Sequence, residues 1–122
     1  MAKLFNLQVI HTTLVGGAMS PIYSDPALNA TLATADRLCV HIIVDGTSAT
    51  DTEVTVDIER SNDGLTWESS NAPKVVEVAT PGGGPESAFN EWELPAAFNR
   101  VVAFADKDNA LVRVIVCGRS AG

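Results

Sequence analysis

Two cysteines and one histidine are the residues of this chain whose types and spacing could hold a metal ion. Cys39 and His41 lie two positions apart in an apolar run that is typical of a strand, so their side chains would share one face. Cys117 lies in the last apolar run, which could pair beside the first. Zinc sites usually draw closely spaced ligand pairs from two segments, and this sequence has only one such pair. We therefore expect no metal and no cofactor.

The same three residues have simpler interpretations. Free cysteine is among the most buried residue types, so Cys39 and Cys117 are expected to be small core residues, with His41 at the edge of the core. A disulfide between the two cysteines is the alternative, if the compartment is oxidising and the two strands are neighbours.

Carboxylates in the sequence could in principle serve acid–base chemistry. Glu91 and Glu93 flank Trp92 and would share a strand face at a separation that glycoside hydrolysis could use, but a solvated face opposite a buried Trp92 explains the same residues. Residues 106–109 begin like a calcium loop, yet the glycine and the distal glutamate of such a loop are absent. The nucleophile motif GxSxG is also absent. We predict that the chain is not an enzyme.

Charge limits the partners that the chain can bind. Of its 122 residues, 8 are basic and 15 acidic, and the net charge of −7 opposes binding to nucleic acid and to anionic membranes. Much of the acid lies between residues 36 and 68, where we expect a solvated strand face; an acidic patch for a basic partner is the alternative. No apolar stretch approaches a membrane span, and residues 1–14 do not resemble a secretory signal.

The elements that must position these residues are strands, and residues 52–67 predict a β-hairpin. Val54, Val56 and Ile58 alternate with polar residues, as expected of a strand with one buried face. Asn62, Asp63 and Gly64 then provide a turn, because Asn and Asp hydrogen-bond their own backbone and Gly accepts positive φ. The chain should return through residues 65–67, with Trp67 anchored in the core.

Six other segments have the alternation or the continuous apolar character of strands. Residues 38–44 are expected to form a central strand that is covered on both faces, and Pro21 limits residues 19–23 to an edge or irregular segment. Regular turns between short strands predict an all-β fold, a single-domain antiparallel β-sandwich or jelly roll of about seven to eight strands. The six segments are residues 4–10, 38–44, 74–79, 89–94, 100–105 and 111–117.

The two ends of the domain, residues 1–122, are expected to differ from its centre. Residues 1–23 would form an N-terminal arm or edge strand, and residues 118–122 a flexible tail. A terminal segment can dock by adding a strand to a neighbour's exposed sheet edge. The candidate docking or oligomer residues are the apolar side chains of this arm, Phe5, Leu7, Val9 and Tyr23.

The alternating strand followed by Ser61-Asn62-Asp63-Gly64 and Trp67 resembles small β-sandwich structural proteins of tailed bacteriophages. The resemblance implies a virion protein, made in the host cytoplasm: a capsid decoration (cement) protein that docks on the phage head, or a tail or head-completion subunit. Its partner would be the major capsid protein or another virion protein, and it would be a homo-oligomer, with a trimer favoured. The alternative is a carbohydrate- or cell-surface-binding module with Tyr23, Trp67 or Trp92 as stacking platforms.

Overall fold

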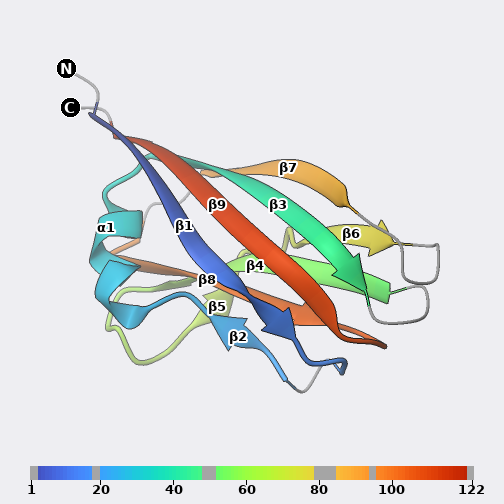
Figure 1. The fold of residues 1–122 in the computed structure, drawn as a ribbon. Coiled ribbons are helices and arrows are strands. Elements are labelled where there is room, and N and C mark those ends of the chain that lie inside the picture. The colour runs from blue at the N-terminus through green and yellow to red at the C-terminus, as the bar shows by residue number, and fades with distance from the viewer. Residues whose placement is uncertain (1–2, 18–19, 48–51, 79–84, 94–95, 121–122) are drawn as a thin grey trace.

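Nine strands and two short helical turns make up the part of the chain that the structure describes (Figure 1). The structure is a computed structural model, and it describes residues 3–17, 20–47, 52–78, 85–93 and 96–120. The strands are β1 (Lys3–Leu14), β2 (Ile22–Tyr23), β3 (Arg37–Thr47), β4 (Thr52–Ser61), β5 (Glu68–Ser69), β6 (Lys74–Val78), β7 (Glu86–Glu93), β8 (Phe98–Ala105) and β9 (Ala110–Ser120). The helical turns are the 3-10 turn η1 (Pro26–Leu28) and helix α1 (Asn29–Ala33).

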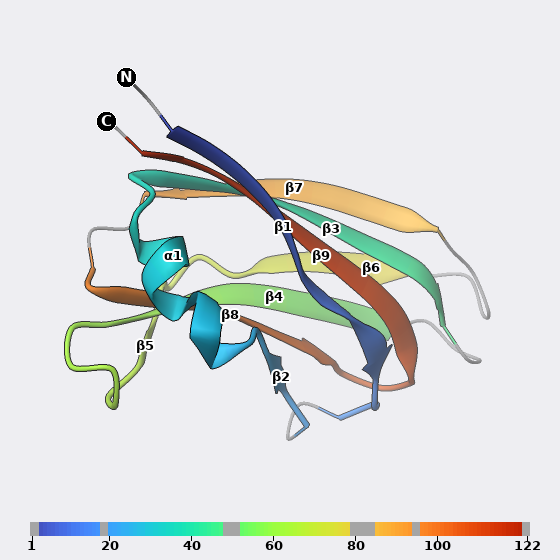
Figure 2. The ribbon, with the colours of Figure 1, turned by 60° about the vertical axis from the view of Figure 1, so that its left-hand side comes forward.

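The strands form two antiparallel sheets packed face to face. Sheet A has the order β1-β9-β3-β7, and sheet B has the order β2-β8-β4-β5, with β6 also paired to β4. Strands β5 and β6 pair with different parts of β4, so together they act as one interrupted strand. The chain passes repeatedly from one sheet to the other, as in a jelly roll (Figure 2). The predicted fold class is confirmed.

Valine is the commonest residue in the layer between the sheets. Period-two alternation turns every second residue of each strand inward, and β-branched side chains suit a pleated, buried surface. Burying one such side chain stabilises the fold by about 1.5–3 kcal/mol, so this layer dominates stability. Its fully buried members include Val40, Ile42 and Val44 of β3, Val54, Val56 and Ile58 of β4, and Val112, Val114 and Val116 of β9.

A β-bulge at Val9 sets which side chains of β1 reach this core. The register with β9 shifts between Gln8 and Ile10. Sequence alternation alone would place Ile10 on the opposite face from Leu7, but the extra residue reverses the phase, and Ile10 and Leu14 are both buried. The bulge therefore keeps Leu7 of the first half of β1 and Ile10 and Leu14 of the second half on the inner face.

The hairpin of residues 52–67 differs from the prediction in its return strand. The chain does not return through Leu65, whose side chain is 86% exposed, and β5 begins only at Glu68, paired with Arg60. The Asp63 carboxylate accepts hydrogen bonds from the backbone N–H groups of Leu65 and Thr66, both at 2.8 Å, and so extends the turn.

Two further expectations were wrong. Strand β3 is central in sheet A, but its burial alternates, because no other layer of the described chain covers the outer face. Gly118 and Arg119 are not a tail, because β9 lies between β1 and β3 and both residues pair on each side. Residues 79, 94 and 121–122, to which predicted strands and the tail extended, lie outside the described residues.

Candidate binding surfaces

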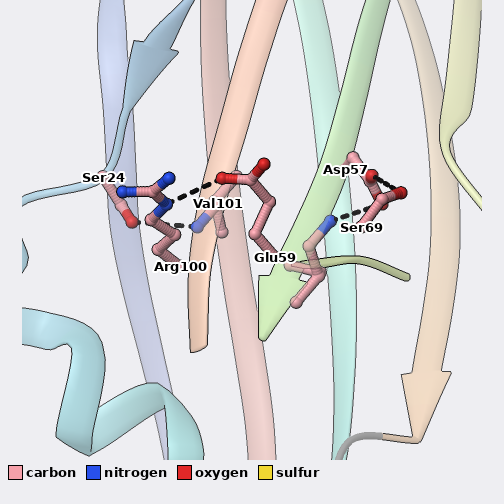
Figure 3. A network of polar contacts seen from close by, with 7 residues as sticks. Ser24, Asp57, Glu59, Ser69, Arg100 and Val101 are labelled. Atoms are coloured by element: carbon pink, nitrogen blue, oxygen red, sulfur yellow. Dashed lines mark hydrogen bonds and ion pairs between the residues drawn. The ribbon is translucent and has the colours of Figure 1, made fainter. Parts of the chain in front are cut away.

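The outer face of sheet B carries an arginine in contact with two aromatic rings. The guanidinium carbon of Arg100, on β8, lies 4.2 Å from the ring centroids of both Tyr23 and Trp67. Arg100 Nε donates to Glu59 Oε1 at 2.7 Å, across the β8–β4 register (Figure 3). Cation–π contact and an ion pair thus hold one guanidinium between three strands and a loop. We call Tyr23, Glu59, Trp67 and Arg100 the arginine cluster.

Local hydrogen bonds explain why the two rings reach Arg100. The buried Ser24 accepts from Val101 N at 2.9 Å through its hydroxyl and donates its backbone N–H to Val101 O, which fixes Tyr23 beside β8 (Figure 3). On the other side, Gly64 has a φ of 76°, which a residue with a side chain rarely adopts. Asn62 Oδ1 accepts from Ala97 N at 3.0 Å, so the turn is also tied to the segment that precedes β8.

The Asp63 carboxylate is the centre of that turn. It accepts from the Leu65 and Thr66 N–H groups and from the Ser61 hydroxyl, which is 2.9 Å away. These hydrogen bonds stabilise the ionised form and hold the pKa of Asp63 well below its usual range. The turn places the Trp67 ring against Arg100, where the side chain is half-buried. The prediction that Trp67 lies in the core was therefore wrong.

Beside the arginine cluster lies an open hollow of about 320 Å³. Its lining includes Asp57, which is 8% exposed and accepts from the Ser69 hydroxyl (Figure 3). The Ser70 hydroxyl also donates to Asp57. Tyr23, 44% exposed, contributes an aromatic wall. Aromatic faces next to fixed polar groups are typical of small-molecule sites. The hollow is lined by Pro21, Tyr23, Thr55, Asp57, Glu59, Pro73, Val102 and Phe104.

The outer face of sheet A carries a different feature, an exposed aromatic stack. Phe89 of β7 lies parallel to His41 of β3, with ring centroids 4.1 Å apart and an interplanar angle of 13°. Phe89 is 62% exposed, and the half-buried Ile115 is the register partner of His41 on the other side. We call Phe89, His41, Ile115 and the adjacent half-buried Ile43 the sheet A patch.

Ion pairs flank the sheet A patch at both ends. At one end Arg37 contacts Glu93 at 2.6 Å and Glu91 at 3.6 Å, and at the other end Arg113 makes two bonds to Asp45 at 2.8 and 2.9 Å. These contacts raise the pKa values of Arg37 and Arg113 and lower the pKa of Asp45. The charged side chains nearest the patch are therefore largely paired within the chain.

The residues whose types could serve chemistry are distributed as follows. Cys39 and Cys117 are register partners on the outer face of sheet A, both as free thiols, and neither is buried, so their predicted core position was wrong. Their place follows from the phase of β3 and β9, which turns the neighbouring valines inward. Glu91 and Glu93 are exposed opposite the buried Trp92, as the solvated-face interpretation predicted. Among the described residues no His, Cys, Asp and Glu side chains form a group that could hold a metal ion.

The proposed arm residues do not form a free arm. Phe5, Leu7 and Val9 are half-buried in β1, which is paired with β9 along its length, and Phe5 and Val9 pack against the core. Tyr23 lies in the other sheet. Within the described residues no helix is long and apolar enough to cross a membrane.

No prediction from the sequence placed Arg100 or Phe89 at a candidate binding surface. Nothing local marks Arg100, because its partners come from strands distant in the sequence. Phe89 did carry a signal: period-two alternation from the buried Trp92 places it on the same outward face as Glu91 and Glu93.

No protein-family model and no curated protein matches the chain. Its fold is similar to that of the PBSX exported protein XepA, with a TM-score of 0.66 and 15% identity over 97% of this chain and 37% of XepA. The SPBc2 prophage-derived protein YomS gives a TM-score of 0.51 and 11% identity over 98% of this chain and 96% of YomS. This chain therefore spans little more than a third of the first protein and nearly all of the second.

A third similar structure is the C-terminal family 22 carbohydrate binding module of Clostridium thermocellum Xyn10B. The TM-score is 0.56 and the identity 9%, over 98% of this chain and 82% of that one. At such identities the likeness establishes a shared fold. The chain is a jelly-roll β-sandwich, an architecture that phage-derived proteins and a carbohydrate-binding module also have.

Proposed function

We propose that this chain is a structural protein of a bacteriophage virion, most specifically a decoration protein that docks on the phage head. The proposal is supported by the jelly-roll fold shared with two phage-derived proteins, XepA and YomS. The observation that carries it is the exposed Phe89 ring of the sheet A patch, stacked on His41. A decoration protein needs a surface of this kind, because its role is to bind other protein subunits.

The composition of the sheet A patch suits a protein partner. Protein interfaces commonly place aromatic and aliphatic side chains at their centre and charged groups at the rim. Phe89, His41 and Ile115 provide such a centre, and the ion pairs of Arg37 and Arg113 provide such a rim. Because these rim charges are already paired, a partner can cover the patch without leaving a buried charge uncompensated.

Net charge also favours this face for assembly. Copies of a chain with a net charge of −7 repel one another wherever acid is in excess. The outer face of sheet B places Glu53 directly opposite Glu77 of β6, whereas the rim of the sheet A patch has basic and acidic groups side by side. The sheet A patch is therefore the better surface for a homo-oligomer, with a trimer favoured, and for the major capsid protein.

The docking element of the N-terminal segment is the edge of β1 rather than its side chains. In the described part of the chain, β1 pairs only with β9 and lies at the end of sheet A. Phe5 and Leu7 face inward, so a partner cannot contact them fully without unpairing β1. The backbone of an edge strand can accept a neighbour's strand while the fold stays intact.

Mass spectrometry of purified particles from the phage or prophage that encodes the chain tests the proposal. We expect the chain to co-purify at a fixed ratio to the major capsid protein. Stripped particles should then rebind the wild-type protein, and Phe89→Asp should weaken rebinding at least tenfold. Val75→Asp is the matched control, since Val75 is a 44% exposed apolar side chain on sheet B. Absence of the chain from the particles would overturn the proposal.

A carbohydrate-binding module is the second candidate, and the hollow on sheet B favours it. Tyr23 presents an exposed ring there, next to Asp57 and Glu59. Trp92 cannot serve as a platform, because it is 5% exposed and its indole N–H donates to Ala72 O at 3.1 Å. Titration with xylan, cellulose and mannan oligosaccharides should change Trp67 fluorescence if this candidate is right, and Tyr23→Ala should abolish the change.

A further inference from the structure

The two free thiols of the chain face one another across neighbouring strands. Cys39 of β3 and Cys117 of β9 are direct register partners in an antiparallel pair, and both side chains lie on the outer face of sheet A. Directly opposed residues in such a pair have Cα atoms about 4.5–5.5 Å apart. A disulfide requires a Cα separation of about 4.4–6.8 Å, so this pair lies within the Cα range of the bond.

Solvent and small molecules can reach the pair. An open hollow of about 520 Å³ lies over it, and Asp36, Arg37, Cys39, Glu91, Cys117, Gly118 and Arg119 line this hollow. Cys117 is exposed, whereas Cys39 is half-buried between Cys117 and Glu91 in the row across the sheet. An oxidant that enters the hollow therefore meets Cys117 first.

We propose that Cys39 and Cys117 form a reversible redox pair, which low-molecular-weight disulfides such as oxidised glutathione convert into a cross-strand disulfide. The Cys117 thiolate attacks one sulfur of oxidised glutathione, the glutathione S–S bond breaks, and one glutathione thiolate leaves. Cys39 then loses its proton to water and attacks the Cys117 sulfur, releasing the second glutathione. Two protein thiols are oxidised and one glutathione disulfide is reduced to two thiols.

The surroundings give the two cysteines different roles in this reaction. Burial, the Glu91 carboxylate and Cys117 all disfavour the thiolate of Cys39 and raise the pKa of its thiol. Cys39 is therefore a poor first nucleophile and acts as the resolving thiol. Opposed Cβ atoms lie about 4.5–5.5 Å apart, against about 3.5–4.5 Å in a disulfide, so the strands must draw together slightly. A bond formed under this strain is more easily reduced, which makes it reversible.

The disulfide would cross-link β3 and β9, and β9 is also paired with β1 on its other edge. Cys117 pairs with Asn6 of β1 as well as with Cys39, so it belongs to a row that crosses β1, β9, β3 and β7. Oxidation should therefore slow the opening of this end of the sheet and stabilise the whole domain against unfolding. Reduction returns the free-thiol state that the structure shows.

Incubation of the folded protein with oxidised glutathione, followed by intact-mass and peptide analysis, tests the proposal. We expect loss of two hydrogen atoms from the mass, loss of both titratable thiols, and a peptide that links Cys39 to Cys117. Dithiothreitol should restore both thiols. Amide exchange of β3 and β9 should be slower in the oxidised form than in the reduced form.

Two single variants separate the assigned roles. Cys39→Ser should accumulate a stable glutathione adduct on Cys117, because no resolving thiol remains. Cys117→Ser should react at least tenfold more slowly, because only the shielded Cys39 is left. Stable glutathionylation of the wild type, disulfide-linked dimers in place of the internal bond, or equal reactivity of the two variants would overturn the proposal.

Discussion

The guanidinium group of Arg100 lies over the indole ring of Trp67, with its central carbon 4.2 Å from the ring centroid. The contact links the turn between β4 and β5 to strand β8. In sheet B, β4 lies between β5 and β8, so the contact spans β4. It explains why the turn is longer than a simple hairpin requires: the additional residues allow Trp67 to reach Arg100. Trp67 therefore forms part of the outer face of sheet B and does not pack in the core.

Trp67→Leu should destabilise the protein by about 1 kcal/mol, because the contact with the half-buried guanidinium is lost. The matched control is Leu65→Ala, two residues earlier in the same turn, where the side chain is 86% exposed. That variant should stay within about 0.5 kcal/mol of the wild type. Urea unfolding monitored by circular dichroism measures both, and equal stabilities would contradict the role given to the contact.

Asp63→Asn should lower the stability at neutral pH, because the amide replaces a carboxylate that accepts three hydrogen bonds. Folding depresses the pKa of Asp63, so the ionised carboxylate stabilises the folded state. This stabilisation is fully present above the pKa of the unfolded chain, about 4. It is lost as the pH falls from there toward the lower, folded pKa. The difference in melting temperature between wild type and variant should therefore shrink below about pH 4, and a constant difference would exclude this explanation.

Gly118→Ala should destabilise the fold by about 1–3 kcal/mol through overpacking. A Cβ atom at this position would lie 2.1 Å from the Phe5 ring, which packs across β9. Phe5→Leu should be milder in the Gly118→Ala background than in the wild type, since the smaller side chain relieves the clash. Gly46→Ala is the control, because a Cβ there meets nothing within 4 Å. Thermal unfolding of the double-mutant cycle gives the coupling.

Deletion of Val9 should be tolerated better than deletion of Thr12. Removing the bulge residue leaves Leu7 and Ile10 in the inward phase, at the cost of the packing of Val9, whereas removing Thr12 turns the fully buried Leu14 outward. Exposing Leu14 should cost about 2–5 kcal/mol, comparable to truncating a core leucine. Chemical unfolding compares the two, and equal damage would show that the phase of β1 is not set at Val9.

Patterns among neighbouring residues determined most of the strands of this protein. Alternation in residues 54–58 and 111–117, and the Asn62-Asp63-Gly64 turn, predicted strands and a reversal that are present, because side-chain period and turn preference depend only on neighbouring residues. Such signals were sufficient to predict an antiparallel β-sandwich or jelly roll. Alternation about Trp92 also placed Glu91 and Glu93 on a solvated face opposite it.

Only the tertiary structure determined which side chains of different strands came into contact. It put Cys39 opposite Cys117, stacked Phe89 on His41 and brought Tyr23 and Trp67 to Arg100. Each of these contacts depends on strand order and register between segments far apart in the sequence, which no local pattern encodes. A single bulge at Val9 reversed the phase of a whole half-strand. Period-two patterning shows that a strand has two faces, but only packing against the second sheet determines which of them is buried.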